Sequence, residues 1–109
     1  MNTKKNKRNY QRAGKVLKDL KIQPSFGETI RSLRECDEIT QVELARQIGV
    51  SRQFLSDVEK DRKVVGVEFA KKLSDAMGYP IETFLQPLIN SQLERAGIKC
   101  HVEIASKAS

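Results

Sequence analysis

The sequence has few of the residue types on which several classes of protein depend. It contains no tryptophan, two cysteines (Cys36 and Cys100) and a single histidine, His101. Two cysteines do not make a disulfide framework, so we expect free thiols in a reducing compartment. No apolar run approaches the roughly 20 residues that cross a bilayer, and the charged N-terminus lacks the apolar stretch of a secretory signal. These absences predict a cytoplasmic protein with no membrane partner.

Residues typical of metal and catalytic sites are also scarce. His101 and Cys100 are neighbours, so in an extended segment they point to opposite sides, and Cys36 adds no usable zinc-ligand spacing. No glycine-rich phosphate-binding loop occurs, and the acidic residues are scattered. We therefore expect neither an enzyme nor a bound metal or cofactor.

Positive charge is concentrated at one end of the chain. Residues 1–23 carry eight basic side chains and one acidic side chain, a net charge of +7, whereas the rest carries 12 basic and 13 acidic residues. In this arm Tyr10, Ala13, Leu17 and Leu20 have helical spacing. We expect a basic arm with an amphipathic helix, which packs on its own domain, a second subunit, another protein or DNA phosphates.

The most informative stretch is TQVELARQIGVSRQFLSDVEK, residues 40–60. Thr40 and Glu43 have the spacing of a capping box, which predicts the start of a helix. Gly49 can end that helix because glycine adopts the left-handed conformation without a Cβ clash. Ser51 is a good N-cap for a second helix, which should continue to the end of the stretch. The pattern predicts two short helices joined by a tight turn.

This stretch resembles the helix-turn-helix of the lambda-repressor/Cro-like (XRE-type) family of DNA-binding domains, and the wider match runs from Phe26 to Leu85. The markers, in order, are Gln41, Glu43-Leu44-Ala45, Gly49-Val50-Ser51, Glu59 and Ala76-Met77-Gly78. The resemblance implies an all-α domain of five helices, which we place at residues 24–85.

The resemblance also implies sequence-specific binding to operator DNA, with the helix of residues 52–60 in the major groove. We expect base contacts from Arg52, Gln53, Ser56 and Asp57. We expect phosphate contacts from Gln41, Ser51, Lys60, Arg62 and Lys63. Arginine suits the two acceptors of guanine, and glutamine suits the donor and acceptor of adenine. The alternatives are a phosphate contact for Arg52, and for Asp57 a role in repelling phosphates.

Two further positions are interpreted through the resemblance. Arg34 is expected to form a structural ion pair with Glu59, at the end of the recognition helix. Asp61 stands where the family usually has glycine, and aspartate adopts the left-handed backbone conformation at some cost. This departure bears on the position of the basic loop that follows.

Residues 86–109 are expected to form a dimerisation region. Pro87 suits the first position of a helix, which should end near Gly97. Beyond it the apolar residues alternate strictly, as in a half-buried β-strand. They are Ile98, Cys100, Val102 and Ile104. A lone strand cannot satisfy its own backbone groups. Its partner could be the same strand of a second subunit or a strand of another protein; otherwise the tail has no fixed structure.

The leading hypothesis is a homodimeric, DNA-binding transcriptional regulator that represses a promoter, including its own. A helix-turn-helix domain with a dimerising strand also resembles, in layout, the HipB-like antitoxins, which implies a toxin protein as a second partner. A third hypothesis is a protein-interaction adaptor, in which the helix-turn-helix is a scaffold and the two ends of the chain bind partners. No pattern in the sequence indicates the operator, an effector or the partner of the basic arm.

Overall fold

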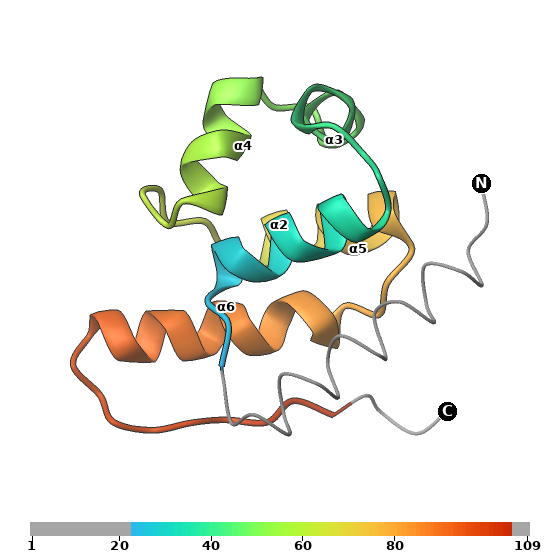
Figure 1. Cartoon of the computed structure of the whole chain (residues 1–109). Coiled ribbons are helices and arrows are strands. Elements are labelled where there is room, and N and C mark those ends of the chain that lie inside the picture. Colours follow the sequence, from blue (N-terminus) through green and yellow to red (C-terminus); the bar gives the residue numbers. More distant parts are fainter. Residues whose placement is uncertain (1–22, 106–109) are drawn as a thin grey trace.

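A computed structural model describes residues 23–105, so the predicted basic arm lies, apart from its last residue, outside the described residues. Five α-helices occur in this part of the chain (Figure 1). They are α2 (Phe26–Cys36), α3 (Gln41–Ile48), α4 (Arg52–Glu59), α5 (Val67–Met77) and α6 (Glu82–Arg95). Residues 23–105 form no β-strand, and none of these helices is long and apolar enough to cross a membrane. The all-α class predicted from the sequence is confirmed.

The predicted capping residues begin the first three of these helices. The Ser25 hydroxyl accepts a hydrogen bond from the Glu28 N–H, and the Glu28 carboxylate accepts one from the Ser25 N–H. Thr40 and Glu43 make the same reciprocal pair at the start of α3. Each pair satisfies N–H groups that a helix end otherwise leaves without partners. Local sequence therefore fixes where these helices begin.

The helices pack around one core, with α3 and α4 on one side and α2, α5 and α6 on the other (Figure 1). Helices α3 and α4 pack together, α2 contacts α4 and α6, and α5 contacts α3 and α6. The side chains that are completely buried at the centre come from all five helices. The largest of them are Ile30, Leu44, Leu55, Leu73 and Phe84. Burying one such side chain contributes about 1.5–3 kcal/mol, and this core holds the two short helices of the helix-turn-helix, which would be marginal alone.

Gly27 permits a close approach between α2 and the end of α4. A Cβ atom at this position would lie 2.5 Å from the carbonyl oxygens of Val58 and Glu59. Any side chain would therefore push the two helices apart. No pattern in the sequence indicates this role for Gly27, because the neighbour that excludes a side chain lies more than 30 residues away in the chain.

The separate helix predicted from Pro87 onward is wrong, because Pro87 lies inside α6. The predicted boundary between residues 85 and 86 thus falls within one continuous helix. Proline inside a helix removes one hydrogen bond and costs about 3 kcal/mol. Phe84 and Leu88, on either side of the proline, are 0% and 3% exposed. Their burial offsets this cost, and so the helix continues through Pro87.

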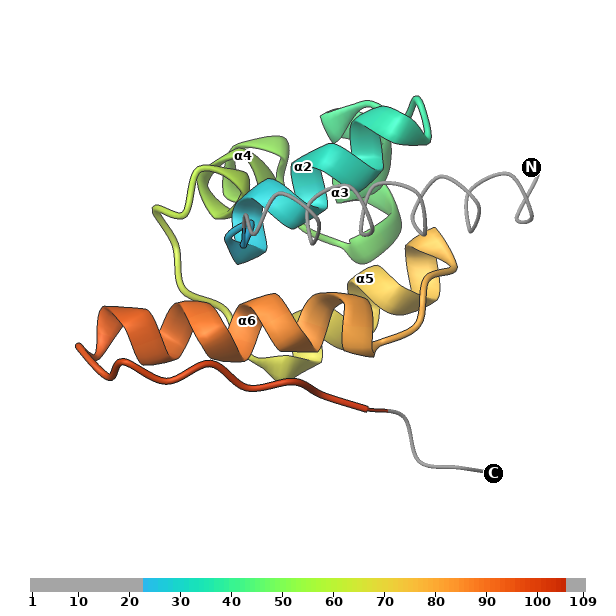
Figure 2. The same cartoon turned by 60° about the horizontal axis from the view of Figure 1, so that its bottom comes forward.

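The dimerising strand predicted for residues 98–104 is also wrong. After Gly97 the chain reverses and runs in extended form along α6 (Figures 1 and 2). The Asn90 side chain donates a hydrogen bond to the Val102 carbonyl (3.0 Å) and accepts one from the Val102 N–H (2.8 Å). The Ile104 N–H donates to the Gln86 side chain at 3.0 Å. Side-chain amides of α6 therefore satisfy backbone groups for which the prediction required a second strand.

The apolar side chains of residues 98–104 differ in their burial. Val102 and Ile104 are half-buried, whereas Ile98 and Cys100 are exposed. The period of two reports burial on one side, and here the partner surface is a helix of the same chain. The prediction mistook this one-sided burial for β-pairing.

Candidate nucleic-acid interface

The turn between α3 and α4 sets the direction of the second helix. Gly49 has a φ of 75°, the left-handed conformation that allows the abrupt end of α3. The Val50 N–H then donates to the Ala45 carbonyl at 2.9 Å. The Ser51 hydroxyl accepts a hydrogen bond from the Phe54 N–H at 3.0 Å and caps α4. Ser51, predicted to contact phosphate, is exposed at the leading end of α4.

The polar side of α4 begins with two exposed residues, Arg52 and Gln53. The Gln53 amide donates to the Asp57 carboxylate at 3.1 Å, and Asp57 is half-buried. Ser56 is only 6% exposed. Of the four predicted base-contact residues, Arg52 and Gln53 are therefore exposed to solvent. Asp57 is half-buried and hydrogen-bonded to Gln53, and Ser56 is buried.

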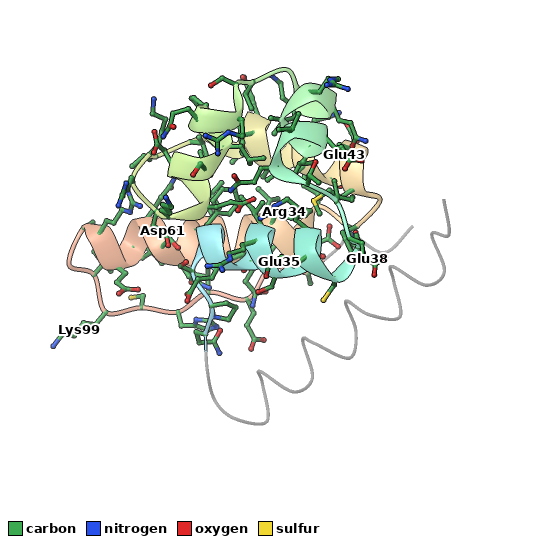
Figure 3. The ribbon with its side chains drawn as sticks, turned by 45° about the horizontal axis from the view of Figure 1, so that its top comes forward. Arg34, Glu35, Glu38, Glu43, Asp61 and Lys99 are labelled. Carbon is green, nitrogen blue, oxygen red and sulfur yellow. The ribbon has the colours of Figure 1, made fainter. Side chains whose placement is uncertain are left out.

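The expected ion pair between Arg34 and Glu59 is present and largely buried from solvent. Arg34 Nε lies 2.7 Å from Glu59 Oε2, and Arg34 Nη2 lies 3.0 Å from Glu59 Oε1. The two side chains are 11% and 3% exposed. The hydrogen bond with Glu59 raises the pKa of Arg34, although burial acts in the opposite direction. Figure 3 shows Arg34 between α2 and the helices above it, where it holds α4 against α2.

Gln41 connects this buried pair to the exposed Arg52. Its amide nitrogen donates to Glu59 at 3.0 Å, and its amide oxygen accepts from Arg52 Nη1 at 3.3 Å. A carboxylate only accepts and a guanidinium only donates, so the chemistry allows only this orientation of the amide. Gln41, which we predicted to contact phosphate, thus also positions Arg52. This link was not predicted from the sequence, although the two residues stand at the first positions of consecutive helices.

The basic loop after α4 presents three exposed cations, Lys60, Arg62 and Lys63. The Arg62 N–H donates to the Asp57 carbonyl at 2.8 Å, which fixes the loop against the end of the helix. The Lys63 ammonium lies 4.7 Å from the centre of the Phe54 ring, within the range of a cation–π contact. Of the three residues predicted to contact phosphate from this loop, Lys60 and Arg62 are therefore exposed, and Lys63 packs on an aromatic ring of α4.

Asp61 anchors this loop to the rest of the domain. It has a φ of 58°, in the left-handed region that glycine adopts more easily. Its carboxylate accepts hydrogen bonds from the Ser25 hydroxyl (2.6 Å) and the Gly27 N–H (3.0 Å). Its carbonyl accepts one from Arg95 of α6 at 2.8 Å. The two carboxylate bonds are what aspartate provides and glycine cannot, and together with the carbonyl bond they tie the basic loop to the start of α2 and the end of α6 (Figure 3).

A second buried polar contact joins the end of α2 to the segment before α6. The Tyr79 hydroxyl donates to Asp37 Oδ1 at 2.8 Å. Tyr79 is 2% exposed, and Asp37 Oδ2 is buried without a hydrogen-bond partner among the described residues. Burial raises the pKa of Asp37, and the hydrogen bond from Tyr79 opposes this shift. This contact ties the end of α2 to the segment that precedes α6.

Comparison with known families agrees with this geometry. The profile of a helix-turn-helix family matches residues 30–84, just over half of the chain. The chain belongs to this helix-turn-helix family. The match includes α3, the turn and α4, together with Arg34 and the basic loop. The family resemblance stated from the sequence is confirmed.

The relatives found by sequence similarity are regulators by name. The chain is 26% identical to the immunity repressor protein of Bacillus phage phi105 over 85 residues, which cover 76% of this chain and 59% of that protein. It is 32% identical over 65 residues to an uncharacterized HTH-type transcriptional regulator of Archaeoglobus fulgidus, covering 60% of this chain and 28% of the regulator. It is 44% identical over 55 residues to a putative HTH-type transcriptional regulatory protein of Methanocella arvoryzae, covering 50% and 17%. The matches thus span less than two thirds of each relative.

Proposed function

We propose that the chain is a sequence-specific DNA-binding transcriptional regulator and that it represses by occupying an operator. The observation that carries the proposal is that Arg52 and Gln53 are exposed at the N-terminal end of α4. Each is positioned by a hydrogen bond to a neighbouring side chain. The names of the relatives support the same role. Because an operator-binding repressor of this family works on intracellular DNA, the proposal also agrees with the cytoplasmic location expected from the sequence.

Arg52 and Gln53 still have hydrogen-bonding groups available to contact bases after their contacts within the protein are made. Arg52 uses one of its five N–H donors on Gln41, which leaves others for the two acceptors of guanine. Gln53 uses one amide N–H on Asp57, and its second N–H and its oxygen can pair with adenine. Asp57 then acts as a positioning residue for Gln53.

The phosphate contacts are proposed to come from the residues around α4. Lys60 and Arg62 are exposed, and the anchored Asp61 between them fixes their backbone before DNA arrives. Ser51 and Gln41 stand at the first turns of α4 and α3, where N–H groups and hydroxyls face an approaching phosphate. A pre-formed set of such contacts lowers the ordering cost of binding.

The proposal further includes a homodimer, because one α4 helix reads only a few base pairs and two half-sites supply the remaining specificity. The antitoxin and adaptor roles stay predictions, since no contact in residues 23–105 favours either over a plain repressor.

The test is a pair of substitutions on a duplex selected from random sequence by the full-length chain. Arg52→Ala should cost about 1–3 kcal/mol on the selected duplex and little on a scrambled duplex. Lys60→Ala should weaken binding to both duplexes and lower the salt slope by about one. Lys99→Ala is the matched control, because Lys99 is an exposed lysine that points away from the helices (Figure 3). Equal losses for Arg52→Ala on both duplexes would show that it contacts phosphate and not a base.

A further inference from the structure

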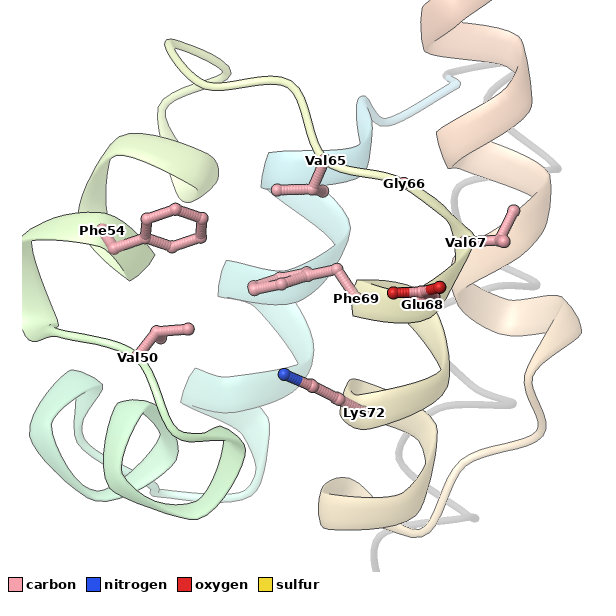
Figure 4. Close-up of a pocket in the computed structure, with 8 residues that line it drawn as sticks. All are labelled: Val50, Phe54, Val65, Gly66, Val67, Glu68, Phe69 and Lys72. Atoms are coloured by element: carbon pink, nitrogen blue, oxygen red, sulfur yellow. The ribbon is translucent and has the colours of Figure 1, made fainter.

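Helix α6 holds the basic loop between α4 and α5 at two points. The Arg95 guanidinium donates a hydrogen bond to the Asp61 carbonyl at 2.8 Å. The Gln92 amide donates a longer one to the Val65 carbonyl at 3.4 Å. The two donors are three residues apart on α6, so they lie on one face of the helix. Val65 also lines the hollow between α4 and α5 together with Phe54 (Figure 4). The loop is therefore fixed near both of its ends.

The C-terminal end of α6 lies on the same side of the molecule as this loop. In Figures 1 and 2 both are seen at the left, away from the start of α6. Arg95 is the last residue of α6. A cation in the last turn stabilises its own helix, but the Arg95 guanidinium reaches to a carbonyl 34 residues away in the chain. The side chain is therefore directed toward the basic loop.

The charge of Arg95 is not neutralised by a carboxylate within residues 23–105. Arg95 is exposed and forms no ion pair in this part of the chain. The Asp61 carboxylate instead accepts hydrogen bonds from Ser25 and Gly27. A guanidinium has five N–H donors, so one bond to a carbonyl leaves others for a ligand. A planar cation with several donors suits a phosphate, which it can bind through two parallel hydrogen bonds.

Three other cations lie next to the carbonyl that Arg95 contacts. Lys60 and Arg62 flank Asp61 in the chain, Lys63 follows, and all three are exposed. Arg95 therefore brings a fourth cation to this surface from a helix that is distant in the sequence. Successive phosphates of one DNA strand are about 3.4 Å apart along the duplex axis. A strand that meets Lys60 and Arg62 thus has further phosphates close by for Arg95.

We propose that Arg95 binds a phosphate of the DNA strand that Lys60 and Arg62 contact, so that the C-terminal end of α6 belongs to the DNA interface. The inference rests on the proposed function and adds to it a contact from outside the helix-turn-helix. Arg95 also lies outside residues 30–84, which match the family profile. Its hydrogen bond to the Asp61 carbonyl positions the guanidinium before DNA binds, and this lowers the ordering cost of the contact.

The first experiment measures the affinity of full-length variants for the selected duplex and the scrambled duplex over a series of salt concentrations. Arg95→Ala should weaken binding to both duplexes and lower the salt slope by about one. Because each phosphate contact contributes about 0.9 to this slope, the ratio of wild-type to variant affinity should fall about 3.5-fold between about 50 mM and about 200 mM salt. Circular dichroism should show the wild-type helix content, since the Arg95 side chain is exposed.

Two control variants separate a direct contact from other effects. Arg31→Ala removes the same charge from α2, where the Arg31 guanidinium pairs with Glu35, and should leave the salt slope unchanged. Gln92→Ala removes the second bond from α6 to the loop but no charge, so it should also leave the slope unchanged. A slope lowered as much by Arg31→Ala would reduce the effect to net charge. A slope lowered as much by Gln92→Ala would mean that Arg95 acts only through the position of the loop. Either result would overturn the proposal.

Uncharged phosphate analogues test the contact directly. Selected duplexes that carry one methylphosphonate, placed at each position in turn, are bound by the wild type and by Arg95→Ala. At one position the methylphosphonate should weaken binding of the wild type but not of Arg95→Ala. This position should neighbour the one at which Lys60→Ala abolishes the effect. If the substitution weakens both proteins by the same factor at every position, Arg95 contacts no phosphate and the proposal is wrong.

Failure of this inference can be told apart from failure of the proposed function. If the wild type prefers the selected duplex and Lys60→Ala lowers the salt slope, but Arg95→Ala does not, only the Arg95 contact is refuted. If the wild type binds both duplexes equally, sequence-specific reading is refuted, and a lower slope for Arg95→Ala on both duplexes would still support the Arg95 contact.

Discussion

Replacing Glu59 with alanine should destabilise the protein far more than breaking an exposed ion pair does. The Glu59 side chain is 3% exposed and accepts two hydrogen bonds from Arg34 and one from Gln41. The alanine variant leaves the Arg34 guanidinium, 11% exposed, without its counter-charge. Removing one partner of such a buried pair costs about 3–5 kcal/mol, because the remaining charge stays desolvated.

Helix α2, which carries Arg34, offers the control. Arg31 and Glu35 form an ion pair at 3.3 Å whose side chains are 65% and 56% exposed. Glu35→Ala should therefore change stability by less than about 0.5 kcal/mol. Urea unfolding of both variants, followed by circular dichroism, gives the free energies from midpoints and slopes. A Glu59→Ala variant as stable as Glu35→Ala would refute the claim that the pair is desolvated and holds α4 to α2.

A double replacement separates the pair from its parts. Arg34→Met combined with Glu59→Leu removes both charges and fills the space with apolar atoms. We expect this variant to lose much less stability than the sum of the two single changes. A strictly additive loss would mean that the two side chains act independently, despite the 2.7 Å contact.

Four other outcomes follow from single contacts. Gly27→Ala should cost at least about 1–3 kcal/mol in urea unfolding because its Cβ would meet two carbonyl oxygens, whereas Gly66→Ala, with no atom within 4 Å of the added Cβ, should cost less than about 1 kcal/mol. Asp61→Gly should destabilise by about 1–3 kcal/mol, since two charged hydrogen bonds outweigh the relief of the positive φ; a gain in stability would contradict the anchoring role. Burial raises the pKa of Asp37, so protonation of this carboxyl stabilises the folded protein. This contribution to the free energy of unfolding is fully present below the unfolded pKa of about 3.9 and is lost as the pH rises through the folded pKa. Asp37→Asn should therefore gain stability relative to the wild type between about pH 3 and pH 7, and a gap that does not change with pH would count against this shift. Asn90→Ala should speed hydrogen exchange at the Val102 amide and leave global unfolding nearly unchanged.

The parts of the fold that the sequence predicted are those set by local chemistry. The capping residues Ser25, Thr40 and Ser51 act within three or four residues of themselves. Their helices therefore begin where the spacing indicated. The pairing of Arg34 with Glu59 bridges 25 residues, and it was predictable only through the family resemblance.

The parts that the sequence did not predict depend on which distant segment lies alongside. The Asp61 carboxylate contacts Gly27 across 34 residues, and Tyr79 contacts Asp37 across 42. No periodicity in the sequence carries that information. The alternation at residues 98–104 correctly indicated one-sided burial, but it could not distinguish a neighbouring strand from the side of α6. Likewise, Pro87 marks a helix start only where burial on both sides does not offset its cost.

The most direct test of the central claim is fluorescence anisotropy of the full-length chain with the duplex immediately upstream of its gene, against a scrambled duplex, over a series of salt concentrations. We expect an affinity advantage of about 10³ or more for the upstream duplex, retained as salt weakens both complexes. Equal affinity for both duplexes, with the same steep salt dependence, would contradict sequence-specific reading by α4 at that site.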